Sequence, residues 1–150
     1  MKNDNHIDIR NRKASFEYAF IDKYLAGLQL TGTEIKSIRE GKANINEGFC
    51  VFNREELFIR NMHISHYFEG TYNNVPEKRD RKLLLNRNEL NKLQNKLKDQ
   101  GLTIIPLRLY INDKGLAKLE IALAKGKKLF DKREDIKKKD NEREINRRLK

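Results

Sequence analysis

Residues 102–124 read LTIIPLRLYINDKGLAKLEIALA, and this stretch decides the fold. Two apolar-rich segments flank the turn sequence Asn-Asp-Lys-Gly at 112–115, a pattern that predicts a β-hairpin. In the second segment Lys118 and Glu120 alternate with large aliphatic residues, so that strand has one apolar and one polar face. Pro106 has no amide hydrogen to donate, and we expect its strand to lie at an edge or to be bulged there.

Four shorter segments with strand patterns precede the hairpin. They are FEYAFI (16–21), YLAGLQL (24–30), INEGFCVF (45–52) and ELFIRN (56–61). The first has aromatic residues at every second position, and the polar pair Asp22-Lys23 separates it from the second. Gly48 predicts a bulge in the third. The charged stretch 69–81 contains a glycine and a proline and predicts an exposed loop.

Two capping boxes predict short helices among these strands. Thr31 at the N-cap is followed three positions later by Glu34, and Gly41 suits the left-handed stop of a helix of about two turns. Asn86 and Glu89 repeat the arrangement ahead of a leucine stripe. About six strands with two or three short helices predict a mainly β protein, a small antiparallel barrel.

The composition excludes several classes of protein. The 150 residues include 33 Lys+Arg against 22 Asp+Glu, a net charge of +11, and only 37% are hydrophobic. No apolar run is long enough for a transmembrane helix, and the N-terminus lacks the apolar segment of a secretory signal. The single Cys50 excludes an internal disulfide framework. We therefore expect a cytoplasmic protein, and its charge favours a polyanionic partner such as nucleic acid.

The basic charge is concentrated at the C-terminus. Residues 125–150 carry twelve basic and six acidic side chains and almost no large apolar ones after Phe130. Such a segment buries too little apolar surface to offset its ordering entropy. We expect a barrel domain at 1–124 and a basic tail at 125–150, disordered when free and helical on a partner. The alternative is a solvated terminal helix packed on the domain.

The sequence shows little sign of catalytic chemistry. His63 and His66 form the only close histidine pair, and no HExxH motif accompanies them, so we expect no metal site. Cys50 lies in an apolar strand and is expected to be an inert core residue. No phosphate-binding loop or nucleophile motif is present. These observations favour a binding protein without cofactor over an enzyme.

Six stretches together resemble one known family, the SsrA-binding proteins (small protein B). They are NRKASFEY (11–18), AGLQLTGTEIKSIREGKANI (26–45), NMHISHY (61–67), RKLLLNRNEL (81–90), GLTIIPLRLY (101–110) and AKGKKLFDKREDIKKKD (124–140). Each is weak alone, but six in family order are specific. The resemblance implies a barrel of the oligonucleotide-binding (OB) type.

The resemblance also implies a function. Members of the family bind the tRNA-like domain of transfer-messenger RNA and deliver it to ribosomes stalled without a stop codon, so that the nascent chain is tagged and the ribosome freed. The implied partners are this RNA and the small-subunit decoding centre and mRNA channel of the ribosome. No membrane, small-molecule substrate or cofactor is implied, and a monomer is expected.

The family's functional positions transfer to this chain as two sets. The RNA-binding positions are Asn11, Arg12, Lys13, Asn61, Arg81, Lys82, Leu84 and Lys118. The ribosome-contacting tail positions are Gly126, Lys127, Lys128, Phe130, Asp131, Lys132, Arg133 and Lys137. Leu84 lies in an apolar segment, where we expect a substitution to damage the core.

The chain departs from the family at two positions. It has Leu25 where members commonly have an acidic residue, and Phe130 where they often have histidine. Phe130 keeps a face for stacking on a base but loses hydrogen bonding and charge.

Two other functions remain open on the sequence. A ribosome-associated OB-type protein would bind rRNA without discriminating the tRNA-like fold. An RNA-modifying enzyme would show turnover on RNA with a cofactor or metal. As an alternative to RNA binding, the lysines are ordinary solvated side chains and the aromatic residues belong to the core.

Overall fold

The computed structural model describes residues 7–67, 74–98 and 101–127. Within them the strands are β1 (Asp8–Arg10), β2 (Tyr18–Leu28), β3 (Ala43–Asn44), β4 (Phe49–Asn53), β5 (Glu56–Arg60), β6 (His63–Ile64), β7 (Arg81–Leu84), β8 (Leu102–Ile111) and β9 (Ala117–Gly126). The helices there are α1 (Ala14–Glu17), α2 (Gly32–Arg39) and α3 (Arg87–Lys96). None of these helices is long and apolar enough to span a membrane.

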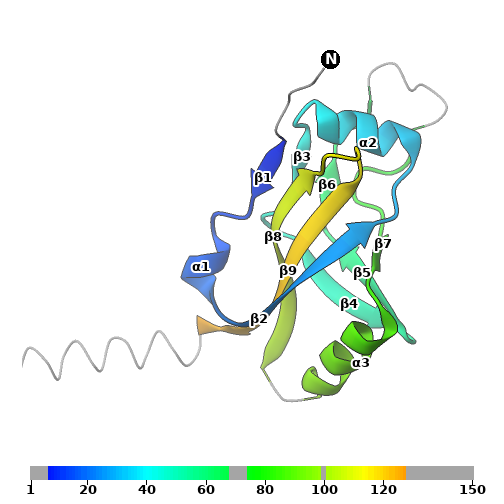
Figure 1. The fold of residues 1–150 in the computed structure, drawn as a ribbon. Helices are drawn as coiled ribbons and strands as arrows, with labels where there is room; N and C mark the ends of the chain where they lie inside the picture. The colour runs from blue at the N-terminus through cyan, green and yellow to red at the C-terminus, as the bar shows by residue number, and fades with distance from the viewer. Residues whose placement is uncertain (1–6, 68–73, 99–100, 128–150) are drawn as a thin grey trace, which may run out of the picture.

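Six antiparallel strands close into a barrel (Figure 1). The sheet runs in the order β1-β8-β4-β5-β7-β2-β9, and β9 also pairs with β8, which completes the ring. Closure leaves few unpaired strand edges. β1 extends the sheet beside β8, and β3 and β6 form a separate two-stranded ribbon. The mainly β, OB-like barrel expected from the sequence is confirmed.

The β8–β9 hairpin forms as predicted. Its strands pair from Ile111 with Ala117 down to the far ends, and Gly115 occupies the turn with a φ of 80°. The register shifts between Pro106 and Arg108, which confirms the expected irregularity at the proline. Leu119, Ile121 and Leu123 of β9 point into the core and are almost completely buried. Each such residue contributes roughly 1.5–3 kcal/mol relative to exposure.

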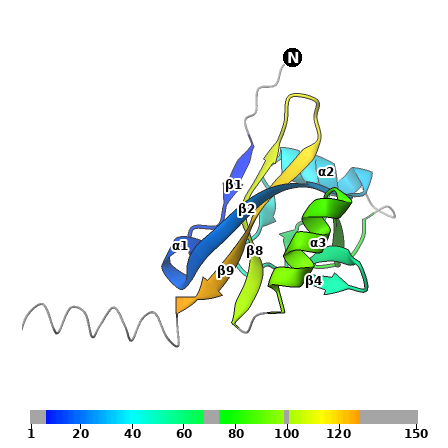
Figure 2. The ribbon, with the colours of Figure 1, turned by 60° about the horizontal axis from the view of Figure 1, so that its bottom comes forward.

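Both predicted capping boxes are present, and the two longer helices close opposite ends of the barrel. The Thr31 side chain accepts from the Glu34 amide while the Glu34 carboxylate accepts from the Thr31 amide. Asn86 and Glu89 make the same exchange at α3. In Figures 1 and 2, α2 and α3 lie at different ends of the strands. Ile38 of α2 belongs to the same buried cluster as the leucines of α3.

Three predictions about the first half of the chain are wrong. The segment 16–21 is not one strand, because Ala14–Glu17 form the short helix α1 and leave Phe16 78% exposed. Asp22-Lys23 do not break the sheet; β2 runs continuously and absorbs an irregular register between Phe20 and Asp22.

The third error concerns the strand expected at 45–52. The Gly48 amide instead donates to the carbonyl of Ile45 in a turn, and β4 begins only at Phe49. Pairing with distant strands therefore overrides the local alternation of side chains.

The ordered domain extends beyond the predicted boundary at residue 124. Lys125 and Gly126 continue β9 and pair with Ala19 and Tyr18 of β2. Most of the expected tail, 128–150, lies outside the described residues, so its predicted disorder and helix formation stay predictions.

Candidate nucleic-acid interface

The outer face of β7, β2 and β9 brings three residues into one row. Gly27 of β2 is paired with Leu84 of β7 on one side and with Lys118 of β9 on the other. Strand alternation turns Leu83 and Leu119, the neighbours of the outer two, into the core. The sheet register therefore gathers side chains from three distant parts of the chain on one exposed surface.

The centre of this row is apolar and, because Gly27 has no side chain, does not protrude from the sheet. Leu25 and Leu84 are 50% and 49% exposed. A Cβ atom added at Gly27 would contact the Leu84 side chain at 3.4 Å. We call Leu25, Gly27 and Leu84 the apolar ledge. The exposure of Leu84 corrects the expectation that it belongs to the core.

The ledge and its lysines match the chemistry of RNA binding. An unstacked base or a ribose can pack on exposed aliphatic side chains, while lysines neutralise the neighbouring phosphates. Lys118 flanks the ledge on β9, and Lys82 alternates with Leu84 on the outward side of β7. These three residues were predicted as RNA contacts, and the structure brings them together.

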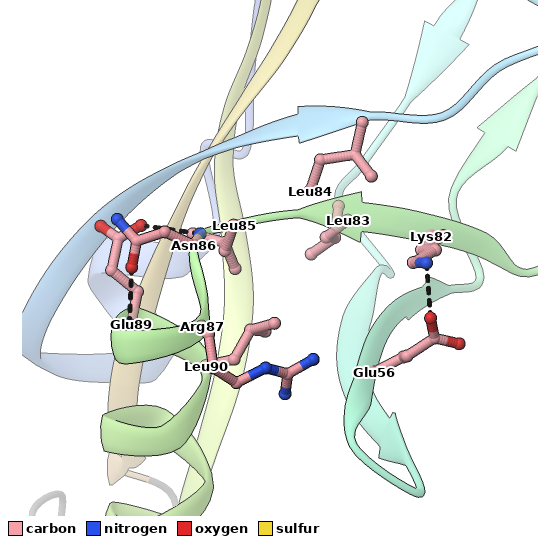
Figure 3. A pocket seen from close by; sticks show the side chains of 9 residues that line it. All are labelled: Glu56, Lys82, Leu83, Leu84, Leu85, Asn86, Arg87, Glu89 and Leu90. Carbon is pink, nitrogen blue, oxygen red and sulfur yellow. Dashed lines mark hydrogen bonds and ion pairs between the residues drawn. The ribbon is translucent and has the colours of Figure 1, made fainter.

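Lys82 lies beside a groove between the end of β7, β5 and the start of α3 (Figure 3). The groove has a volume of about 410 Å³. Its wall includes Leu84, Arg87 and Glu56. Lys82 Nζ lies 2.5 Å from a carboxylate oxygen of Glu56.

Arg81 lies inside the fold and not on the predicted RNA-binding surface. Its side chain is 0% exposed. Nε donates to Glu34 at 2.6 Å, and Nη1 donates to the Met62 carbonyl at 2.6 Å. Nη2 donates to the Glu77 carbonyl at 3.0 Å. Arg81 therefore positions β7 beneath the partly exposed Lys82 and does not face outward toward a ligand.

Glu34 is the shared partner of this interior network. It is 3% exposed and also accepts from Arg79 at 2.6 and 3.0 Å. Burial raises the pKa of Glu34, but hydrogen bonds from Arg79 and Thr31 and the charge of Arg81 outweigh it, so the pKa lies below its ordinary value. One carboxylate thus joins the start of α2 to β7 and the residues preceding it.

The predicted positions Asn11, Arg12 and Lys13 lie at another place, between β1 and α1. The Asn11 side chain donates to the Pro106 carbonyl at 2.9 Å, so it is attached to β8. Lys13 forms an exposed ion pair with Glu47 at 3.3 Å. Arg12 is exposed.

Asn61, another predicted contact, follows β5. Its backbone has a φ of 58°, and it lines a depression with His63 and Lys78. His63 lies 3.2 Å from Glu77. The predicted RNA-binding set is therefore divided among three places on the surface, with Arg81 in the interior, and of the three only the β7–β2–β9 face combines lysines with exposed leucines.

No cluster of three or more His, Cys, Asp or Glu side chains with metal-binding geometry occurs within 7–67, 74–98 and 101–127. Cys50 is buried in the core as predicted, and burial raises the pKa of its thiol.

Two tail positions are described. Gly126 ends β9, and Lys127 Nζ lies 3.4 Å from the Ser15 carbonyl of α1. The remaining predicted ribosome-contacting residues are outside the described residues: Lys128, Phe130, Asp131, Lys132, Arg133 and Lys137.

Sequence reasoning missed Gly27 and Glu56 as members of this site. Gly27 carries no local signal, because only the pairing of β2 with both neighbours makes it the centre of the row. Glu56 has the appearance of an ordinary strand-edge charge until β7 is placed beside β5. Leu25 was noted only as an unusual residue for its position.

Comparisons with known proteins agree on one family. The family model described as "SmpB protein" matches residues 8–150. The "SsrA-binding protein" of Christiangramia forsetii is 60% identical over 143 residues, covering 95% of this chain and 91% of the relative. That of Phocaeicola vulgatus is 58% identical, with 96% of each chain covered. A solved structure described as "tmRNA-SmpB: a journey to the center of the bacterial ribosome" matches with a TM-score of 0.69 and 42% identity, covering 82% of this chain and 86% of the other.

Proposed function

Because the chain belongs to the SmpB family, we propose that it is the protein partner of transfer-messenger RNA (SsrA RNA) in trans-translation. It binds the tRNA-like domain of this RNA and delivers it to ribosomes stalled without a stop codon. The nascent peptide is then tagged and the ribosome is released. The observation that carries this function is the near full-length similarity to SsrA-binding proteins.

The β7–β2–β9 face supports a specific mode of binding. Lys118 and Lys82 would neutralise phosphates on either side of the apolar ledge, and Leu25 and Leu84 would pack against an unstacked base or ribose. Because the row is set by strand register, its geometry exists before RNA arrives. Pre-organisation of this kind lowers the entropic cost of binding.

We assign no bond-making step to the protein itself. Peptide transfer belongs to the ribosome, and aminoacylation of the RNA belongs to a synthetase. The place of action is the ribosome in the cytoplasm. The basic tail that follows β9 would enter the mRNA channel left empty by a truncated message, where rRNA phosphates surround it.

A binding assay with Lys118→Ala tests the RNA interface. We expect the affinity of the protein for the tRNA-like domain to fall. The slope of log affinity against log salt concentration should become shallower by about one, because one phosphate contact is lost. Lys92→Ala removes an equally charged, exposed residue from α3 and should leave the affinity and its salt dependence nearly unchanged.

Thermal unfolding of both variants, measured in parallel, checks that the fold is intact. Equal affinity of Lys118→Ala and Lys92→Ala would remove Lys118 from the interface. Equal binding by the wild-type protein to the tRNA-like domain and to an rRNA fragment would contradict the proposed function.

A further inference from the structure

In the groove beside the ledge, two cations lie near the carboxylate of Glu56; the second acidic residue of its wall, Glu89, serves the cap of α3. Glu56 of β5 contacts Lys82 of β7 at 2.5 Å (Figure 3). Arg87, the first residue of α3, lines the same groove, and its Nη1 donates to the carbonyl of Glu55 at 3.1 Å. Glu56 therefore interacts with both basic groups of the groove.

Glu56 is ionised at neutral pH, because its pKa lies below the ordinary value of a carboxyl group. The hydrogen bond and charge of Lys82, together with the charge of Arg87, lower the pKa of its carboxyl group. A carboxylate and a phosphate are recognised by lysine and arginine in the same way, through charge-assisted hydrogen bonds to their oxygens. The protein's own acid thus occupies a place where an RNA phosphate would find two cations.

The contact is exchangeable. The side chains of Lys82 and Glu56 are 34% and 47% exposed, so water and salt reach the pair and weaken it. An incoming phosphate therefore has to displace only a weak ion pair. The buried pair of Arg81 and Glu34, one residue away on the inward side of β7, has no such access to solvent.

The groove is continuous with the apolar ledge. Lys82 and Leu84 lie on the outward side of β7, and both line the groove. Leu84 also belongs to the ledge, so the two features share a residue. An RNA strand that packs a base or ribose on Leu84 would bring a neighbouring phosphate within reach of Lys82.

We propose that this groove is a phosphate subsite of the RNA interface, which Glu56 fills in the free protein and leaves when an RNA phosphate binds Lys82 and Arg87. The inference rests on the proposed function and adds a residue that lowers the affinity of the groove for any RNA phosphate. An RNA that contacts only the groove must compete with Glu56. An RNA that also fits the ledge gains contacts that offset the displacement.

Glu56→Gln tests the subsite against a matched control, Glu40→Gln. Both variants remove one negative charge from an exposed ion pair with a lysine, but Glu40 pairs with Lys42 after α2, at the other end of the barrel from α3 (Figure 1). Affinity is measured at several salt concentrations for the tRNA-like domain and for a single-stranded RNA of the same length.

Glu56→Gln should bind both RNAs about two- to five-fold more tightly at low salt, the range of one exposed ion pair. The proportional gain should be the same for every RNA that places a phosphate in the groove, because the cost of displacing Glu56 is common to all of them. The salt dependence of its affinity should steepen by up to about one in slope. In the wild-type protein the Glu56 carboxylate released on binding takes up a cation, which offsets part of the cation release from the RNA, and glutamine takes up none. Glu40→Gln should change neither quantity appreciably.

Lys82→Gln, made in the wild-type protein and in the Glu56→Gln variant, provides the second measurement. Its cost in affinity should be larger in the Glu56→Gln variant, because only without the carboxylate is Lys82 fully available to phosphate. Identical behaviour of Glu56→Gln and Glu40→Gln, with wild-type binding intact, would overturn the subsite alone. Failure of the wild-type protein to prefer the tRNA-like domain would overturn the proposed function, and the subsite with it.

Discussion

Glu34 illustrates how much of the interface depends on one buried side chain. Its carboxylate accepts hydrogen bonds from the Thr31 amide and from two arginines that precede and begin β7. A buried ion pair is weak evidence for stability, since burying both charges is costly, but removing one partner leaves an uncompensated charge in the interior. Glu34 therefore controls both stability and the position of β7.

Glu34→Gln should lower the free energy of unfolding by about 3 kcal/mol, because Arg81 would remain buried without its counter-ion. Glu47→Gln, which removes the partner of an exposed lysine, should cost less than about 1 kcal/mol. Urea denaturation of the three proteins provides the comparison. Similar losses for both variants would show that the network contributes no more than a surface pair.

The same residue predicts a pH dependence. Its folded pKa lies below the ordinary value of 4.5, so the unfolded state binds more protons between the two values. This contribution to stability is fully present above the unfolded pKa and is lost as pH falls through the folded pKa. As pH falls below the unfolded pKa, Glu34→Gln should therefore lose less stability than the wild-type protein, as followed by urea unfolding at each pH.

At the scale of elements, the two capped helices are locally alike but differently connected. Each begins with a reciprocal pair of hydrogen bonds between the N-cap residue and the glutamate three positions later. In α3, Glu89 serves the cap. In α2, Glu34 serves the cap and the arginine network together. The start of α2 is thus coupled to β7.

Thr31→Ala and Asn86→Ala should each lower the free energy of unfolding by about 1 kcal/mol. Their responses to Glu34→Gln should differ. The cost of Thr31→Ala should change in that background, because both residues share one network, while the cost of Asn86→Ala should add independently. A double-mutant cycle by urea denaturation measures this, and full additivity at Thr31 would contradict the coupling.

At the scale of the whole molecule, the barrel closes before the chain reaches most of its basic tail. The last pair of β2 and β9 joins Tyr18 to Gly126. Residues 128–150 contain ten of the 33 Lys+Arg residues. We propose that RNA recognition belongs to the barrel and that the tail acts on the ribosome.

Truncation after Lys127 should leave the thermal transition unchanged and abolish tagging on stalled ribosomes. RNA affinity should fall modestly and its salt slope should decrease, because cations are lost. Circular dichroism, filter binding and an in vitro tagging assay measure the three properties. Full tagging by the truncated protein would contradict the tail's role, and loss of the thermal transition would show that the tail belongs to the domain.

A milder change separates arrival at the ribosome from later steps. Replacing Asp131, Lys132 and Arg133 with alanine should spare RNA binding and ribosome recruitment while impairing peptide transfer. Loss of recruitment in this variant would place the segment at an earlier step.

The amino-acid sequence alone predicted the features that depend on neighbouring residues. The turn at 112–115, the irregularity at Pro106 and both capping boxes follow from local backbone and hydrogen-bonding chemistry, and all were confirmed. Lys118 was correctly placed on the outer face of its strand, because buried and less buried residues alternate from Ala117 to Ile121. The composition also predicted the polyanionic partner.

Only the tertiary structure decided which residues meet. Strand register placed Gly27 between Leu84 and Lys118, a relation among three segments that lie far apart in the chain. It also turned Leu84 outward and Arg81 inward, although both lie in one short basic and apolar segment. The physical reason is that a strand pattern defines two faces, but closure of the barrel determines which face is buried. A buried arginine is tolerated here because Glu34, 47 residues away in the chain, supplies its counter-charge.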